Sequence, residues 1–101
     1  MNSLILVPLI DQSESFLAEV ESYAALMFTR EEIAVILEVD TSELVALLQD
    51  QQTPASKAFQ RGRLKREAEV RKGIFDLAQN GSSPAQTFAM KLIENAKSSD
   101  L

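Results

Sequence analysis

Residues 29–48, TREEIAVILEVDTSELVALL, contain two helix-start signals that lie eleven residues apart. Thr29 with Glu32, and Asp40 with Glu43, each have the spacing of a capping box. In a capping box a side-chain oxygen accepts from the third amide of a new helix, and the Glu reaches back to the capping residue. Only about two or three turns of helix and a tight corner fit between the two boxes. Two short helices this close must cross steeply, so the stretch predicts a helix-turn-helix unit.

The corner of this unit falls at Glu38 and Val39, between helices expected at about 30–37 and 41–50. Small Ala34 lies where these two helices approach, and Val39, Leu44 and Leu47 supply apolar contacts that lock them together. A left-handed backbone at the corner is costly for a residue with a side chain. Because the corner residue is Glu38, we expect a corner that is more open than one made by glycine.

The remaining pattern predicts an all-α fold of about five helices, in which a long helix and a terminal helix follow the helix-turn-helix. A first helix capped by Asp11 would bury positions at helical spacing, namely Leu17, Val20, Ala24 and Met27. The long helix would begin at Thr53-Pro54 and stop near Gln79, and a last helix opened by Ser83-Pro84 would end near Lys97. The expected segments are an apolar arm at 1–12, a helix-turn-helix domain at 13–52, a helical hairpin at 53–97 and a tail at 98–101.

Composition limits the class of protein. The 101 residues contain no Cys, which excludes a disulfide framework and suits a cytoplasmic location. No segment approaches the ~20 apolar residues of a membrane span. The apolar arm at Leu4 to Ile10 lacks a basic flank and is interrupted by Pro8, so we expect no signal peptide and no membrane partner.

Catalysis is not expected. The chain has neither His nor Cys, so the commonest general base and the strongest nucleophile are both missing. There is no Gly-rich loop that could cradle a phosphate. We therefore expect no enzyme, no catalytic residue, no metal site and no cofactor.

Charge is unevenly distributed along the chain. Residues 1–56 carry ten carboxylates and a single cation, Arg30, whereas residues 57–72 carry seven cations and two carboxylates. The net charge of the whole chain is −5. This asymmetry predicts a polarised molecule with a concentrated basic stripe, and the acidic total argues against indiscriminate coating of nucleic acid.

The second helix of the helix-turn-helix presents few groups suited to DNA. Its outward side chains include Thr41, Ser42, Val45 and Gln49. Thr, Ser and Gln can contact base edges, but this helix has no Arg or Lys for phosphates, and Glu43 and Asp50 lie nearby. Two interpretations stay open, namely reading of the major groove and retention of the unit as architecture or a protein contact.

The long helix carries the basic stripe. At about 100° per residue, five cations fall within roughly a third of its circumference; they are Lys57, Arg61, Lys65, Arg71 and Lys72. Phe59, Val70, Ile74 and Leu77 cluster on the opposite side, with Arg63 and Arg66 on or near it. We expect the second half of this helix to pack in a core and the first half to project. The stripe suits phosphates, but pairing with carboxylates of the acidic half and plain solvation remain alternatives.

Residues 58–91, AFQRGRLKREAEVRKGIFDLAQNGSSPAQTFAMK, resemble the segment that follows the helix-turn-helix in phage small terminase subunits and their prophage relatives. The shared run is R-G-x4-E-x3-R-x5-L-A-x2-G-x3-A. The residues that match it here are Arg61-Gly62, Glu67, Arg71, Leu77-Ala78, Gly81 and Ala85. With the helix-turn-helix included, the resemblance covers about Thr29 to Lys91.

This resemblance implies a recognition component of viral DNA packaging. Such a protein forms a ring-shaped homo-oligomer, binds double-stranded DNA at the packaging site and engages a large terminase. The implied DNA contacts fall on Thr41, Ser42, Val45 and Gln49. Two alternative functions remain. The protein is a phage transcriptional regulator, or it is an oligomeric protein-interaction adaptor whose helix-turn-helix no longer reads DNA.

Overall fold

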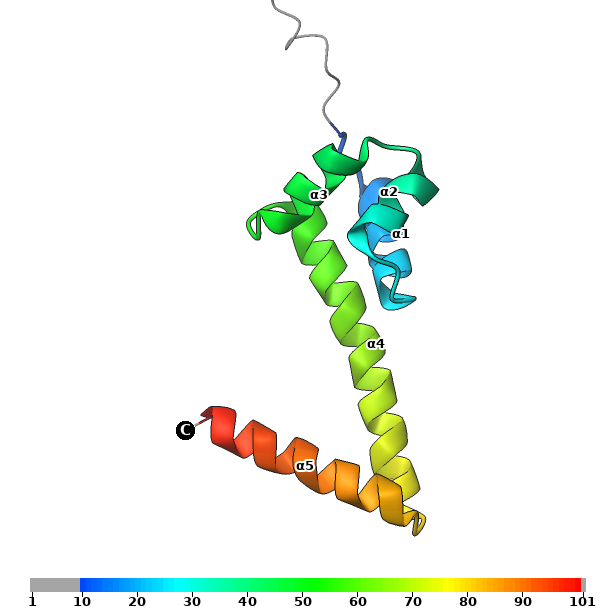
Figure 1. Ribbon diagram of the computed structural model, residues 1–101, viewed down its shortest axis with the longest axis vertical. Coiled ribbons are helices and arrows are strands. Elements are labelled where there is room, and N and C mark those ends of the chain that lie inside the picture. Colours follow the sequence, from blue (N-terminus) through cyan, green and yellow to red (C-terminus); the bar gives the residue numbers. More distant parts are fainter. Residues whose placement is uncertain (1–9, 101) are drawn as a thin grey trace, which may run out of the picture. The chain divides into compact units, whose positions relative to one another are not determined.

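The structure, a computed structural model, describes residues 10–100, and over this range it consists of five helices without a strand (Figure 1). The helices are α1 (Glu14–Ala25), α2 (Arg30–Leu37), α3 (Thr41–Gln49), α4 (Pro54–Gln79) and α5 (Ser83–Asp100). The predicted all-α class with about five helices is therefore confirmed. Most of the predicted arm at 1–12 lies outside the described residues.

The chain divides into two compact units, residues 1–65 and residues 66–101, which we call unit 1 and unit 2. The division falls inside α4 rather than at the expected boundary after residue 52. Unit 1 contains α1, α2, α3 and the first half of α4. Unit 2 contains the second half of α4 and α5.

The starts of α2 and α3 show how the two helix-start signals act. Thr29 makes a complete capping box, because its Oγ1 accepts from the Glu32 amide at 3.1 Å and its own amide donates to Glu32 Oε1 at 2.9 Å. Asp40 accepts from the Glu43 amide at 2.9 Å. No return bond from Glu43 is present, and its Oε1 is buried without a hydrogen-bond partner in the described part. The second box is therefore only half formed.

The corner between α2 and α3 is left-handed. Glu38 has φ 58° and ψ 42°, and the Val39 amide donates back to the Ala34 carbonyl at 3.1 Å. This bond closes the end of α2 as a glycine-type C-cap does. The more open corner expected for a non-glycine residue is not what the structure has. The chain adopts the left-handed conformation at Glu38 in spite of its cost.

The core of unit 1 draws on all four of its helices. α2 packs against both α3 and α1. The buried apolar side chains are Val20, Ala24, Ile33, Ala34, Leu44, Leu48, Ala55, Ala58 and Phe59. Leu17, Leu37, Val39 and Leu47 are half-buried and pack around them.

Two expectations for α1 were wrong. Its N-cap is Ser13, whose side chain accepts from the Phe16 amide, and not Asp11. Met27 is 57% exposed and so does not belong to the core. The helix ends at Ala25, and Met27 takes a positive φ of 69° in the turn that follows, which breaks the helical spacing on which the expectation depended.

We expected the second half of α4 to pack in a core and the first half to project, and this expectation was also wrong. Its first half packs in the core of unit 1 through Ala55, Ala58, Phe59 and Gly62. In its second half Val70 and Leu77 are exposed. The start at Pro54 agrees with expectation, and the Thr53 hydroxyl accepts there from the Ser56 amide at 3.1 Å.

Unit 2 is a pair of helices with a very small interior. Gly81, with φ 98°, makes the turn between them, and the Ser82 hydroxyl accepts from the Ala85 amide at 3.4 Å at the start of α5. Ala85 and Ala89 are the buried residues of α5. The expected tail at 98–101 was wrong as far as the structure describes it, because α5 continues to Asp100.

Candidate nucleic-acid interface

The predicted recognition surface lies on α3. Thr41, Ser42 and Gln49 are exposed, as expected, while Val45 is half-buried. The Ser42 hydroxyl donates to Asp40 Oδ2 at 3.0 Å, so part of its hydrogen-bonding capacity is already used. The sequence of α3, TSELVALLQ, contains no cation. This surface therefore offers polar contacts to bases but no charge for phosphates.

A carboxylate stands at the beginning of the same helix. The hydrogen bond from the Glu43 amide, followed by that from the Ser42 hydroxyl, lowers the pKa of Asp40 below its ordinary value. Both bonds favour the charged form of the carboxyl group. Like an ordinary aspartate, Asp40 is ionised at neutral pH, and it repels a phosphate that approaches the start of α3.

Three cations of the basic stripe lie in unit 1. Lys57 is exposed and makes no ion pair within residues 10–100. Arg61 Nε donates to Glu21 Oε1 and Lys65 Nζ donates to Glu21 Oε2, each at 2.7 Å. One carboxylate of α1 thus holds two of these three cations.

The two ion pairs of Glu21 change the pKa of its carboxyl group. The hydrogen bond from Lys65, and then that from Arg61, lowers the pKa of Glu21 below its ordinary value. The side chain of Glu21 is 23% exposed, whereas those of Arg61 and Lys65 are 52% and 65% exposed. The cations keep most of their surface open to solvent, so a phosphate can compete with Glu21 for them.

The last two cations of the stripe lie in unit 2. Arg71 Nη2 donates to Glu67 Oε1 at 2.8 Å across one turn of α4. Lys72 is exposed and has no ion pair in the described part of the chain. Surface pairs of this kind contribute little to stability. Arg71, in a weak surface pair, and Lys72, without an ion pair in the described part, can therefore both contact a partner.

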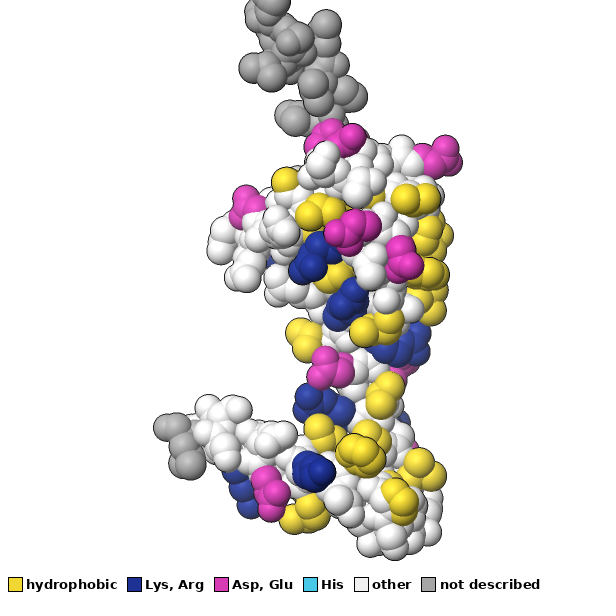
Figure 2. All heavy atoms as spheres, viewed as in Figure 1, with side chains coloured by type: hydrophobic (Ala, Val, Ile, Leu, Met, Phe, Trp, Pro, Cys, Tyr) yellow, Lys and Arg dark blue, Asp and Glu magenta, His cyan; other side chains and the backbone are white. Residues whose placement is uncertain are grey.

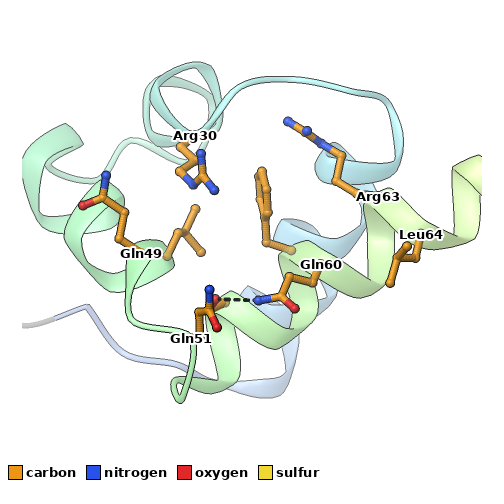
Figure 3. A pocket seen from close by; sticks show the side chains of 9 residues that line it. Arg30, Gln49, Gln51, Gln60, Arg63 and Leu64 are labelled. Carbon is orange, nitrogen blue, oxygen red and sulfur yellow. Dashed lines mark hydrogen bonds between the residues drawn. The ribbon is translucent and has the colours of Figure 1, made fainter. Parts of the chain in front are cut away.

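A groove in unit 1 was missed by the sequence analysis. Arg30, the first residue of α2, and Arg63 of α4 each place a guanidinium over the Phe59 ring, at 5.0 and 4.5 Å from its centroid. The groove beside them has a volume of about 510 Å³ and also reaches Gln49, the last residue of α3. In Figure 3 Arg30 and Arg63 line one side of this groove, with Gln49 at one end.

Two signals in the sequence point to this groove. Arg30 is the single cation of residues 1–56, and Arg63 follows Phe59 by four residues, which places both side chains on one face of a helix. Neither signal pairs Arg30 with Arg63, because 33 positions separate them in the chain. Of the predicted α3 contacts, Gln49 lines the groove.

Within residues 10–100, no three His, Cys, Asp or Glu side chains are grouped so that they could hold a metal ion. Over the same residues, no helix has both the length and the apolar character needed to cross a bilayer.

Comparison with known proteins gives no relative. No family model, no curated protein and no solved structure matches the chain.

Proposed function

We propose that this chain is a non-enzymatic, double-stranded-DNA-binding protein of the phage helix-turn-helix type. In this proposal it is a small-terminase-like recognition component of DNA packaging, and its further partner is a large terminase. The observation that carries the proposal is the position of Gln49. This residue ends the exposed face of a helix-turn-helix second helix and lines a groove bearing two arginines. Base-edge contacts and phosphate contacts are thereby available side by side.

The phage-type run in α4 and α5 supports the family part of the proposal. Three of its small residues have structural reasons to be there. Gly62 lies against α1, Gly81 has a positive φ, and Ala85 is buried. Two other members of the run, Glu67 and Arg71, form an ion pair. These residues therefore serve the packing of the helices and the turn between α4 and α5. DNA binding needs a separate test.

Unit 2 supports homo-oligomer formation. Its buried residues on α5 are two alanines, while large apolar side chains stay exposed on both helices, as the yellow patches in Figure 2 show. The exposed ones are Val70, Phe75, Leu77, Phe88, Met90 and Ile93. Residues 66–101 carry five cations and five carboxylates. Copies of this unit can therefore approach one another without net repulsion, and their apolar faces gain from mutual burial.

A second candidate function is an oligomeric protein-interaction adaptor that does not bind DNA. One observation favours it, which is that Arg61 and Lys65 both already form ion pairs with Glu21. In that case the stripe serves the structure of unit 1 and not a phosphate backbone.

Glu21 allows a sharp test between the two functions. If Arg61 and Lys65 contact DNA, Glu21 competes with the phosphates, and Glu21→Gln tightens binding. Glu19→Gln is the matched control, because it removes the same charge from an exposed position of α1 that has no ion pair in the described part. Binding is measured by fluorescence anisotropy with a labelled duplex at two salt concentrations.

The DNA-binding proposal expects affinity that falls steeply with salt, because neutralised phosphates release counterions. It also expects Glu21→Gln to bind more tightly than Glu19→Gln, and Arg61→Gln to bind more weakly than the natural chain. Absence of binding at low salt by the natural chain in its assembled form would contradict the proposal and favour the adaptor.

A further inference from the structure

The groove of unit 1 gathers donors from three elements. Arg30 comes from the start of α2, Gln49 from the end of α3, and Gln60 and Arg63 from α4, with Gln51 in the intervening turn. Figure 3 shows Arg30 and Arg63 along one side and Gln51 and Gln60 along the other. Polar side chains therefore line the groove on two sides, and of these the Gln60 amide already donates to Ser56 Oγ at 3.3 Å.

The two guanidinium groups are only partly used by the protein. Arg63 Nη2 donates to the Phe28 carbonyl at 2.8 Å, but Arg63 Nε is buried without a hydrogen-bond partner. Arg30 stacks on Phe59 and makes no hydrogen bond or ion pair within residues 10–100. A guanidinium has five N–H donors. The guanidinium of Arg30, which is exposed, is thus free for a ligand, while Arg63 keeps one donor without a partner.

Nothing in the lining of the groove neutralises these charges. Unit 1 contains ten carboxylates and five cations, yet none of the residues that line the groove is acidic. Arg30 is also placed at the first position of α2, where the helix dipole disfavours a cation. Two like charges against one ring repel each other, and the ring quadrupole offsets this only in part. An anion in the groove would relieve the repulsion.

The arrangement of donors favours a tetrahedral anion. A planar carboxylate is satisfied by one guanidinium fork, whereas a phosphate group presents oxygens in several directions. Here two guanidiniums come from different helices, and Gln49 and Gln51 line the same groove. We propose that this groove is a phosphate-binding site, built by Arg30 and Arg63 over Phe59.

Two sources can supply the phosphate, a phosphodiester of DNA or free inorganic phosphate. The proposed function, on which this part of the inference rests, favours DNA, because Gln49 belongs both to the groove and to the exposed face of α3. The phosphate contacts that α3 cannot make would then come from residues outside it. The site itself does not depend on DNA being the source.

The site is tested on the full chain by following the arginine side-chain N–H signals in nuclear magnetic resonance spectra. Inorganic phosphate is titrated at constant ionic strength, with chloride and acetate as separate arms. The expected result is a saturable shift of the Arg30 and Arg63 signals with phosphate that is much weaker with acetate. Arg30→Gln should abolish the saturable shift at Arg63. Lys97→Gln is the control with the same charge change, and its titration should match that of the natural chain.

Arg30→Gln is the informative variant because Arg30 is exposed, whereas Arg63 also holds the Phe28 carbonyl. Shifts that do not saturate, or that are equal with phosphate and chloride, would overturn the site. Saturation by acetate at the same concentration as by phosphate would overturn the phosphate assignment and indicate a carboxylate partner.

A duplex-DNA arm identifies the source. If DNA supplies the phosphate, the same signals shift with duplex, and Arg30→Gln weakens DNA binding on the order of tenfold and lowers the salt slope by about 1. Unchanged DNA affinity in Arg30→Gln, together with a saturable phosphate shift, overturns DNA as the source while supporting the site. Absence of DNA binding by the natural chain, with the phosphate shift intact, refutes the proposed function and leaves the site standing.

Discussion

Gly62 of α4 lies directly against the backbone carbonyl oxygen of Glu21 in α1. A Cβ added at position 62 would overlap this oxygen and would also stand 3.0 Å from the Ala24 Cβ. Backbone atoms cannot move aside as the end of a side chain can. The two helices therefore approach this closely only because residue 62 has no side chain.

Gly62→Ala should destabilise unit 1, because α4 must shift away from α1 to admit the methyl group. We expect the free energy of unfolding to fall by about 1–3 kcal/mol, as measured by urea denaturation. Gly73→Ala is the matched control on the same helix, since nothing lies within 4 Å of the added Cβ. It should raise stability by about 0.5–1 kcal/mol through helix propensity. Equal effects of the two substitutions would contradict this explanation.

Glu38→Gly should stabilise the chain. Glu38 holds a left-handed backbone at the α2–α3 corner, which costs a residue with a Cβ about 1 kcal/mol and costs glycine little. The midpoint of thermal or urea unfolding should therefore rise. Glu38→Gln keeps the backbone cost and removes the charge, so it isolates the conformational effect. A gain in Glu38→Gln as large as that in Glu38→Gly would assign the effect to charge instead.

Local signals predicted the fold well because they act within a few residues. The Thr29–Glu32 box spans three positions, and α2 begins where it indicates. The error in α4 has a different physical origin. Val70 and Leu77 are more hydrophobic than Ala55, Ala58 and Gly62, yet the smaller residues are buried because they let helices approach closely. The periodicity of apolar residues reports where hydrophobic side chains lie, but it does not show where two helices approach each other closely.

The candidate site was less predictable for a related reason. Thr41, Ser42 and Gln49 follow from the periodicity of one helix, and the structure leaves them exposed. The groove joins Arg30 to Arg63 through the packing of α2 on the rest of unit 1. The same holds for the contact of Glu21 with Arg61 and Lys65, which lie 40 and 44 positions away. Tertiary packing alone brings these groups together.

The ion pairs of Glu21 predict a dependence of stability on pH. Because the folded state lowers the pKa of Glu21, its contribution is fully present above the ordinary glutamate pKa and is lost as pH falls through the lowered value. The natural chain should therefore exceed Glu21→Gln in stability at neutral pH, and the difference should shrink in acid. Urea denaturation at a series of pH values measures it. A difference that stays constant down to strongly acidic pH would contradict the role given to Glu21, with Glu19→Gln as the control.

Phe88→Ser tests the role of unit 2 in assembly. Phe88 is 58% exposed on α5, so its replacement removes apolar surface without opening a core. If unit 2 carries the contact between copies, the mass measured by light scattering should fall relative to the natural chain. Asn95→Ser, at an exposed polar position of α5, should leave the mass unchanged. A natural chain that is a single copy at all concentrations would refute the oligomer. A large ring favours packaging, and a dimer favours transcriptional regulation.

Glu21 also determines the register of α4 along α1. Its carbonyl oxygen fits against Gly62, while its carboxylate holds the residue before and a residue one turn after, Arg61 and Lys65. Sliding α4 by a single turn would bring a side chain against the carbonyl oxygen, because the residues one turn away from Gly62 all have a Cβ. The two helices therefore have one permitted alignment, and a polyanion that draws away Arg61 and Lys65 would loosen it from outside.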